Sequence, residues 1–520
     1  MGWNPSKRKR EEMEEEEEGE VELSLLEALE NSQGQNVQAL DIRGLKKLVL
    51  SFERRLKENL EARMKYAENP EKFAESELEL HEEITKLKTL AGAPELYPEL
   101  VQLNTIPSIL GLLTHDNTDI ASDVVALIQD LTDEDVFDDA QDPATVLVHA
   151  LLENNALELL VQNLARLDET DPDESTAVYN TLATIENMIE VKPTVAELVC
   201  ERTKLLRFLL GRIKPREFDS NKQYATEILA ILLQNSSANQ RRLGGMNGVD
   251  AVLQAVALYK SKDPKSGDEE EMVENLFDCL CSLVMPMENK ERFVKAEGVE
   301  LMIIIMKQKK SVYGSAMRTL DFAMTKFSPA CERFVDVLGL KTLFAAFMGK
   351  IAANRKIQGG RYQEELEERI ISLIASLFDG ISRGSRRDRL LSKFVESEFE
   401  KIDRLMELYM RYSDRVKTET ERMDRLQLDD LEIDDDERYN RKLESGLYTL
   451  QLIAVILGHL WYSDHPKIRA RVELLLRQHC LSKENVKGIL QEYHDNIGDL
   501  DGPEEKERAQ TKVQKFIDAM

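Results

Sequence analysis

The feature that most constrains this chain is a repeated alternation of a short apolar helix with a longer one. The short segments begin at Asn104, Asn154, Thr203, Asn247, Glu297 and Leu338. Each is followed by a polar connection and a longer helical pattern, such as "SNKQYATEILAILLQN". Corresponding points recur about every 40 to 50 residues, which is the range of armadillo and HEAT units. One such unit cannot bury its apolar face alone, so the pattern predicts a stacked solenoid.

Glycines at the start of the second helix favour armadillo units over HEAT units. Gly248, Gly298 and Gly339 occupy this position, where glycine permits a tight turn between helices. We therefore predict an all-α fold, a right-handed superhelical armadillo solenoid with an N-terminal helical cap and a C-terminal helical closing segment. The third helix of each unit is expected to line a concave groove.

The patterning also predicts the order of regions along the chain. We expect a disordered acidic tail with a basic cluster over 1–38, capping helices over 39–95, and about six armadillo repeats over 96–412, the last one degenerate. An acidic mobile loop over 413–440, helices over 441–500 and a tail helix over 501–520 complete the prediction.

The charge balance restricts the classes of partner. The chain carries 97 acidic and 69 basic residues, a net charge of -28. This excess repels phosphate backbones, so we expect no direct nucleic-acid binding. It attracts basic partners and raises the rate at which they are encountered. The predicted partners are proteins with basic segments, and a homodimer is a further possibility left open by the sequence.

Motifs that would indicate an enzyme or a membrane protein are missing. The five cysteines are odd in number and fit a reducing compartment, where thiols act as small core residues. The longest apolar run, Gly446–Tyr462, is shorter than the roughly 20 residues of a membrane span. No phosphate-binding loop, metal-ligand spacing or local nucleophile motif is present, so we expect no catalytic residue, no cofactor and no metal.

The acid-rich stretch "HDNTDIASDVVALIQDLTD", from His115 to Asp133, allows two interpretations. Its acids could form an acid–base site, or they could decorate one helix of the stack. Asn117 or Thr118 can cap a helix here, and Asp119 suits the positive end of the helix dipole. The apolar residues form a wide face for packing. This favours a third helix that offers only Asp130 to a partner.

A compact basic cluster, Lys7, Arg8, Lys9 and Arg10, precedes an acidic run near the start of the chain. It fits a nuclear-import signal read by an import carrier, although paired tracts of opposite charge can also carry no address.

Five longer stretches resemble the beta-catenin-like protein 1 family. They are "NPEKFAESELEL" (69–80), "LYPELVQLNTIPSILGLLTHDNTDI" (96–120), "ENLFDCLCSLVM" (274–285), "DRLMELYMRY" (403–412) and "EYHDNIGD" (492–499). The resemblance implies a nuclear armadillo protein associated with pre-mRNA splicing, near a complex of a U-box ubiquitin ligase and a Myb-domain splicing factor. It also implies binding of basic, nuclear-localisation-type segments, a vertebrate link to a cytidine deaminase, and an import signal at Lys7–Arg10.

The expected groove differs from that of importin-type armadillo proteins. Their third helices carry Trp and, four residues later, Asn, whereas the only tryptophans here are Trp3 and Trp461. Aligned helix endings instead predict a groove lined by acids and amides, with charge pairing to Lys/Arg-rich segments. The candidates are Asp130, Glu186, Asn187, Gln234, Glu274 and Asp278.

Two functions remain open on these grounds. The first is a nuclear protein-interaction scaffold in splicing that binds basic segments through the acidic groove. The second is a transport adaptor that carries basic cargo into the nucleus.

Overall fold

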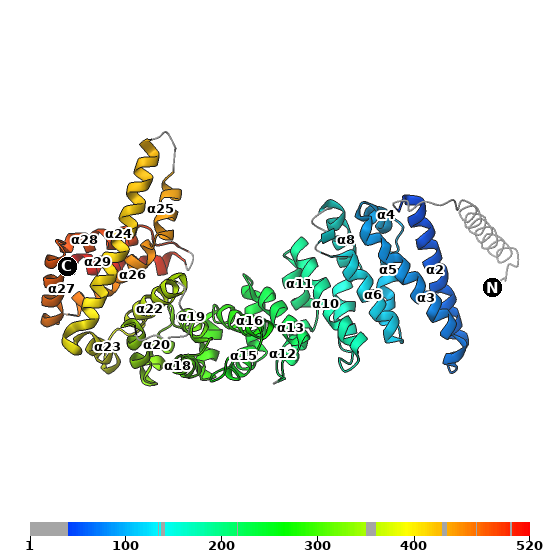
Figure 1. Cartoon of the computed structure of the whole chain (residues 1–520), viewed down its shortest axis with the longest axis horizontal. Coiled ribbons are helices and arrows are strands. Elements are labelled where there is room, and N and C mark those ends of the chain that lie inside the picture. The colour runs from blue at the N-terminus through cyan, green and yellow to red at the C-terminus, as the bar shows by residue number, and fades with distance from the viewer. Residues whose placement is uncertain are drawn as a thin grey trace, which may run out of the picture. The chain divides into compact units, whose positions relative to one another are not determined.

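The computed structural model describes residues 40–133, 135–136, 141–215, 217–349, 360–428, 434–463, 465–499 and 502–520. The secondary structure of these residues is helical, without a strand. They form two compact units (Figure 1). Unit 1 contains the described residues up to Gly211 together with Asp219–Leu232, and unit 2 contains Arg212–Phe218 and Leu233–Met520.

Unit 1 is a layer of neighbouring long helices backed by shorter ones. The long helices are α2 (Ile42–Lys65), α3 (Ala74–Leu87), α6 (Thr118–Leu131), α10 (Pro172–Val191) and α13 (Ser220–Leu233). Helix α3 packs against α2 and α6, and α6 packs against α10. The shorter helices are α4 (Tyr97–Gln102), α5 (Ile106–Gly111), α8 (Gln141–Glu153), α9 (Ala156–Leu164), α11 (Val195–Arg202) and α12 (Leu205–Arg212).

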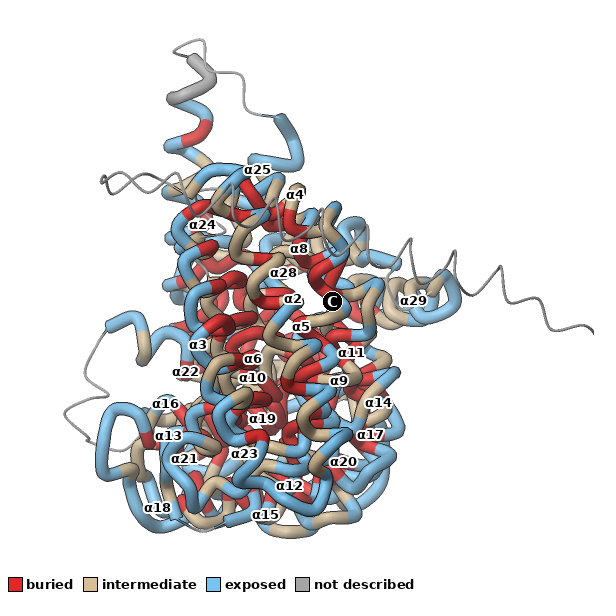
Figure 2. The backbone as a smooth tube through the Cα atoms, turned by 90° about the vertical axis from the view of Figure 1, so that its right-hand side faces the viewer, coloured by how far each residue is buried: buried red, intermediate tan, exposed pale blue. Residues whose placement is uncertain are grey.

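Helix α6 illustrates why these sequences fold as they do. The Asn117 side chain accepts a hydrogen bond from the backbone N–H of Asp119 at 3.0 Å, which confirms the predicted cap. Its apolar positions recur every three or four residues, so Val124, Leu127 and Leu131 share a buried stripe (Figure 2). Burial of each such side chain stabilises the fold by roughly 1.5–3 kcal/mol. The acid-rich stretch is therefore a packing helix.

Unit 2 repeats this arrangement. Its long helices, α16 (Gly267–Leu283), α19 (Tyr313–Met324), α22 (Gly360–Gly380) and α26 (Leu447–Tyr462), each pack on the next. The shorter helices are α14 (Ser237–Gly245), α15 (Gly248–Ala257), α17 (Met287–Lys295), α18 (Gly298–Gln308), α20 (Ser328–Asp336), α21 (Gly339–Phe347) and α23 (Ser385–Val395). We call α3, α6, α10, α13, α16, α19 and α22 the third helices.

The end of unit 2 differs from the prediction. Helix α24 (Glu400–Leu428) continues through most of the expected mobile loop at 413–440, and α25 (Asp435–Glu444) lies beside it in Figure 1. An ion pair between Arg438 and Asp424, 2.6 Å apart, joins the two helices. The loop prediction is wrong for these described residues. Its abundant acids suggested a loop, but they alternate with bases that pair along the helix surface.

Helices α27 (Pro466–Gln478), α28 (Lys483–Asp495) and α29 (Pro503–Ala519) close unit 2. Helix α29 packs on α26, where the Trp461 indole N–H donates to the carbonyl of Ala519 at 2.8 Å. Beneath it, the His459 ring stacks on Phe378 and bonds to Asp379 at 2.9 Å. Burial lowers the pKa of His459 to about 4, although Asp379 opposes this effect.

The three glycines are required for a reason other than the predicted one. The left-handed backbone falls on the residues before them, Asn247, Glu297 and Leu338, with φ values of 61°, 59° and 64°. The glycines themselves begin helices α15, α18 and α21. A Cβ on Gly298 would lie 2.5 Å from the Phe293 ring. These glycines therefore allow the close approach of a side chain from the preceding helix, and the turn itself accepts residues other than glycine.

Replacement of Gly298 by alanine is expected to lower the free energy of unfolding by about 1–3 kcal/mol, because the added methyl group overpacks the contact with Phe293. Gly245→Ala is the matched control, since nothing lies within 4 Å of that Cβ position. Denaturant unfolding of both variants measures the difference. Equal stability of the two variants would contradict the packing explanation.

The stability of unit 2 is expected to fall as the pH decreases from about 6.5 to 4. The folded pKa of His459 lies below its unfolded value, so the unfolded state binds more protons in this window. The loss contributed by His459 is about 3 kcal/mol. Denaturant unfolding of the wild type and of His459→Gln across this range measures the effect. The variant should show a shallower pH dependence, and identical slopes would contradict the assignment to His459.

Candidate partner-binding site

The structure places three of the predicted groove residues in unit 1 and three in unit 2. Asp130, near the end of α6, pairs with Lys88 of the 3-10 helix Lys88–Gly92, with 3.1 Å between Oδ2 and Nζ. Glu186 of α10 accepts a hydrogen bond from the Tyr224 hydroxyl at 2.5 Å. Asn187 is half-buried beside it. The acids predicted to attract a basic partner in this part of unit 1 are therefore already engaged.

Gln234 is not on a third helix. It follows the last residue of α13, Leu233, in an exposed turn. The pattern "SNKQYATEILAILLQN" predicts a helix through Asn235, but the chain turns at Gln234 and Asn235, and the φ of Asn235 is 55°. Gln234 therefore lies outside the helix to which the sequence assigned it, and its contact with a partner stays a prediction.

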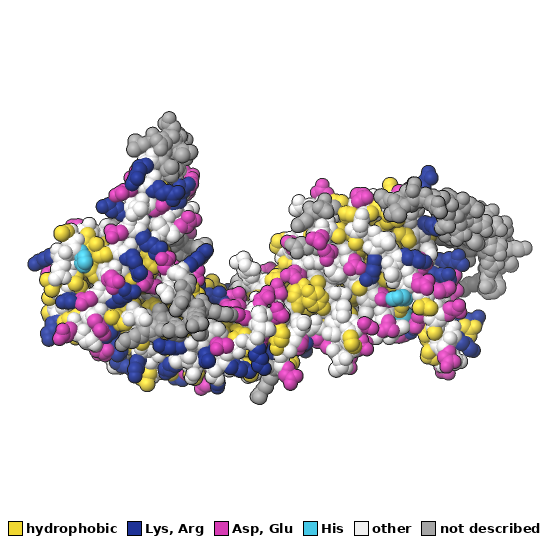
Figure 3. Space-filling model, viewed as in Figure 1, with side chains coloured by type: hydrophobic (Ala, Val, Ile, Leu, Met, Phe, Trp, Pro, Cys, Tyr) yellow, Lys and Arg dark blue, Asp and Glu magenta, His cyan; other side chains and the backbone are white. Residues whose placement is uncertain are grey.

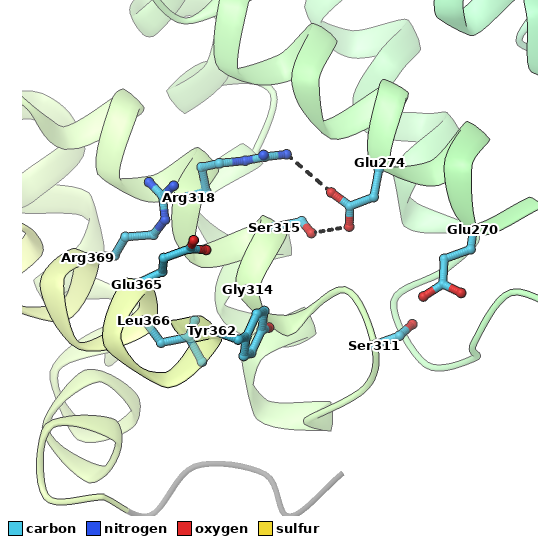
Figure 4. A pocket seen from close by; sticks show the side chains of 10 residues that line it. All are labelled: Glu270, Glu274, Ser311, Gly314, Ser315, Arg318, Tyr362, Glu365, Leu366 and Arg369. Carbon is cyan, nitrogen blue, oxygen red and sulfur yellow. Dashed lines mark hydrogen bonds and ion pairs between the residues drawn. The ribbon is translucent and has the colours of Figure 1, made fainter. Parts of the chain in front are cut away.

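Of the two remaining candidates, Glu274 lines a pocket of unit 2 (Figure 4), and Asp278 lies about one turn further along α16. The volume of the pocket is about 490 Å³, and α16, α19 and α22 supply most of its walls. The lining residues are Glu270, Glu274, Ser311, Gly314, Ser315, Arg318, Tyr362, Glu365, Leu366 and Arg369.

Arg318 forms ion pairs with both predicted acids, Glu274 and Asp278. Its Nη2 lies 3.3 Å from Glu274 and 2.6 Å from Asp278, and the Ser315 hydroxyl donates to Glu274 at 2.6 Å. Figure 4 shows the Arg318 and Ser315 side chains reaching the Glu274 carboxylate from α19. A basic ligand would have to compete with this arginine. Contact of Glu274 and Asp278 with a basic partner stays a prediction, and Arg318 already offsets part of their charge.

A second pocket, in unit 1, has a different charge. Its volume is about 550 Å³, and it lies between the N-terminal halves of α3, α6 and α10. The lining residues are Ala74, Glu77, Leu78, His81, Asn117, Asp119, Ile120, Ser122, Asp123, Ala126, Asp173, Thr176, Ala177 and Asn180. The lining includes four carboxylates and no lysine or arginine. Figure 3 shows acidic side chains and a histidine over α3 and α6 on this face. We call this the carboxylate pocket.

The four carboxylates differ in how far they are compensated. Glu77 pairs with Arg63 and accepts a bond from the Asn117 amide at 3.0 Å. Asp123 Oδ2 lies 2.5 Å from His81 Nδ1. Asp119 and Asp173 are exposed, and neither has an ion pair within the described part of the chain.

The environment of Asp123 is unfavourable for its charge. Burial raises the pKa of this carboxyl, and the neighbouring Asp119 raises it further. His81 and Lys88 lower it, but they do not fully offset the burial. A cation placed beside Asp119 and Asp123 would therefore reduce a repulsion that the folded chain contains.

The sequence carried a signal for this pocket that our prediction missed. Each wall uses the same spacing, with residues at positions 0, 3, 4 and 7 of a helical stripe. The stripes are 74, 77, 78 and 81; then 119, 122, 123 and 126; then 173, 176, 177 and 180. The predicted groove residues come from the ends of helices, whereas the pockets form at the beginnings of helices.

Other kinds of site are not indicated by the described residues. No group of three or more His, Cys, Asp or Glu side chains is placed there to hold a metal ion. Cys200, Cys279, Cys281 and Cys331 are buried free thiols, as expected of packing residues, and Cys480 is exposed. No single described helix is long and apolar enough to cross a membrane; the bent pairs α8–α9 and α25–α26 meet that test only when each pair is counted together.

Repeated helical units with side-chain pockets between third helices define the class: an armadillo-type scaffold for protein interactions. The family model described as "Catenin-beta-like, Arm-motif containing nuclear" matches residues 23–491. The chain belongs to this family, which confirms the predicted family and its armadillo solenoid fold. It is a family of scaffold proteins and not of enzymes.

Curated relatives support the assignment. The chain is 42% identical to beta-catenin-like protein 1 of Homo sapiens over 485 residues, covering 91% of this chain and 85% of that protein. The homolog of Schizosaccharomyces pombe is 34% identical, with coverages of 92% and 83%. Among solved structures, a chain from a study of the interaction between cadherin and beta-catenin is similar at a TM-score of 0.45 and 13% identity, covering 95% of this chain and 94% of that one.

Proposed function

We propose that this protein is a nuclear interaction scaffold that binds Lys/Arg-rich segments of partner proteins in the carboxylate pocket. The observation that carries the proposal is the lining itself, with four carboxylates and no lysine or arginine. A bound ammonium or guanidinium group would lie beside Asp119 and Asp173, the two carboxylates of the lining without an ion pair among the described residues.

Charge alone favours the encounter, and the pocket supplies the specificity. The net charge of -28 attracts basic segments from a distance, and this attraction weakens as salt is added. Within the pocket, a cation offsets the repulsion between Asp119 and Asp123. The aliphatic part of a Lys or Arg side chain can also contact the apolar lining at Leu78 and Ile120.

A purely structural role accounts for only part of this lining. Asp119 and Asp173 lie in the first turns of α6 and α10, where acids stabilise a helix through its dipole. Asp123 lies a full turn further along, where this effect has fallen off, and burial opposes its charge. Helix stabilisation does not account for Asp123, which has a partner in His81 of α3, and a bound cation would give its charge a second partner.

The proposal extends to the setting of the protein. We infer association with pre-mRNA splicing complexes, including a U-box ligase and a Myb-domain factor, and import through Lys7, Arg8, Lys9 and Arg10, which lie outside the described residues. The alternative of a transport adaptor has less support, because the third helices lack the tryptophans of importin-type grooves.

Neutralisation of the pocket is expected to weaken binding of a basic peptide about tenfold. The variant is Asp119→Asn with Asp123→Asn and Asp173→Asn, and the loss reflects roughly 0.3–1 kcal/mol for each exposed charge pair. The probe is a fluorescent peptide with four consecutive Lys/Arg residues, measured by anisotropy at low and high salt.

The matched control removes three exposed acids of unit 1 that do not line the pocket: Glu61→Gln, Glu71→Gln and Asp142→Asn. This control has the same net charge as the pocket variant, so it should bind the peptide like the wild type. Equal losses in the two variants would reduce the effect to net charge and overturn the pocket as the binding site.

Deletion of Lys7–Arg10 is expected to prevent nuclear accumulation of a fluorescent fusion in cells. The same variant should still recover splicing proteins from nuclear extract, because the carboxylate pocket is unchanged. Retention in the nucleus would contradict the import role, and loss of splicing partners in extract would contradict a scaffold role independent of import.

A further inference from the structure

A stacked pair of tyrosines lies beside the carboxylate pocket and joins α10 to α13. Tyr179 of α10 and Tyr224 of α13 have ring centroids 4.5 Å apart and planes inclined by 27°. Both residues belong to unit 1. Hydrophobic side chains gather over α10 on the face seen in Figure 3. The pair lies on two of the third helices, and neither helix carries a tryptophan of the kind found in importin-type proteins.

The two rings have different surroundings. The Tyr224 hydroxyl donates to Glu186 at 2.5 Å, and burial, together with Glu186, raises the pKa of this phenol. The ring of Tyr224 is thereby fixed. Tyr179 stacks on it and remains 45% exposed. Nearly half of Tyr179 is therefore open to solvent on the sides that Tyr224 does not cover.

An exposed aromatic face beside a carboxylate is suited to a cation. The π face of tyrosine attracts ammonium and guanidinium groups, most strongly arginine, which also stacks flat on the ring. Glu186 adds negative charge at the rim of the pair. Packing between α10 and α13 explains why the rings stack, but it does not explain why nearly half of Tyr179 is left open to solvent.

The distance between the two sites determines how far apart the cationic side chains of the ligand must lie. Asn180, the residue after Tyr179, lines the carboxylate pocket, so the two sites adjoin on α10. Neighbouring helix axes lie about 8–10 Å apart. An extended chain advances about 3.3 Å per residue. Two side chains about three residues apart would therefore reach the pocket and the tyrosines together.

We propose that the ligand of unit 1 is an extended segment carrying two cationic side chains about three residues apart, one in the carboxylate pocket and one, preferably arginine, stacked on Tyr179. This inference rests on the proposed function for the first of the two positions and adds the second position, the spacing and the preference for arginine.

Binding of labelled peptides tests the proposal, with Arg-Ser-Ser-Arg in a Gly/Ser background as the matched probe. Tyr179→Leu is expected to weaken its binding about fivefold, because leucine keeps an apolar surface and loses the π face. Tyr179→Phe keeps the ring and should bind like the wild type. Thermal unfolding of both variants controls for loss of the fold. Equal affinity of the Leu and Phe variants would overturn the stacking role.

A second probe, with the two arginines separated by ten residues, tests the spacing. The wild type should bind it about fivefold more weakly than Arg-Ser-Ser-Arg, and Tyr179→Leu should remove most of this preference. Equal binding of both peptides by the wild type would overturn the predicted spacing.

Comparison with the Asp119/Asp123/Asp173 variant separates this inference from the proposed function. Loss of Arg-Ser-Ser-Arg binding in the acid variant alone overturns the tyrosine site and supports the carboxylate pocket as a binding site. Loss in Tyr179→Leu alone overturns the pocket as a basic site and supports the tyrosines. Absence of binding by the wild type at low salt overturns both.

Discussion

The apolar stripe that each third helix can bury only against its neighbours is the constraint on which this structure depends. Val124 and Leu127 of α6 have no exposure because α3 and α10 pack on either side of that helix. This side-by-side packing also places the polar stripes of successive helices beside one another. A pocket between third helices is therefore a by-product of the same contacts that hold the fold together, and its chemistry depends on the few positions that face away from the core.

The two pockets show how one geometry can have opposite electrostatic outcomes. In unit 2, Arg318 faces Glu274 and Asp278 and forms an ion pair with each of them. In unit 1, the corresponding walls carry Asp119, Asp123 and Asp173, and His81 is the only titratable base in the lining. The overall charge of -28 therefore does not identify a binding site. What matters is whether the neighbouring helix supplies the counter-charge.

This dependence explains what the sequence could and could not predict. The helical repeat, the armadillo class and the family follow from patterns along the chain, and they are confirmed. The state of individual acids does not follow, because their partners are distant: Lys88 is 42 residues from Asp130, and Arg318 is 44 residues from Glu274. The stacking of Tyr179 on Tyr224 also spans two repeats. The spacing of residues within each stripe can be read from the sequence. Only the packing of the helices shows which stripes lie side by side.

The contact between Gly298 and Phe293 has a consequence for how such repeats diverge. Each glycine lies five residues after the bulky side chain that crowds it, as in Leu243 with Gly248 and Phe334 with Gly339. In an earlier repeat the same spacing pairs Leu151 with Ala156, so a leucine at the first position occurs with either glycine or alanine at the second. A repeat can therefore vary at its turn residue, whereas the glycine after it can gain a side chain only where the residue five positions earlier leaves room for a Cβ.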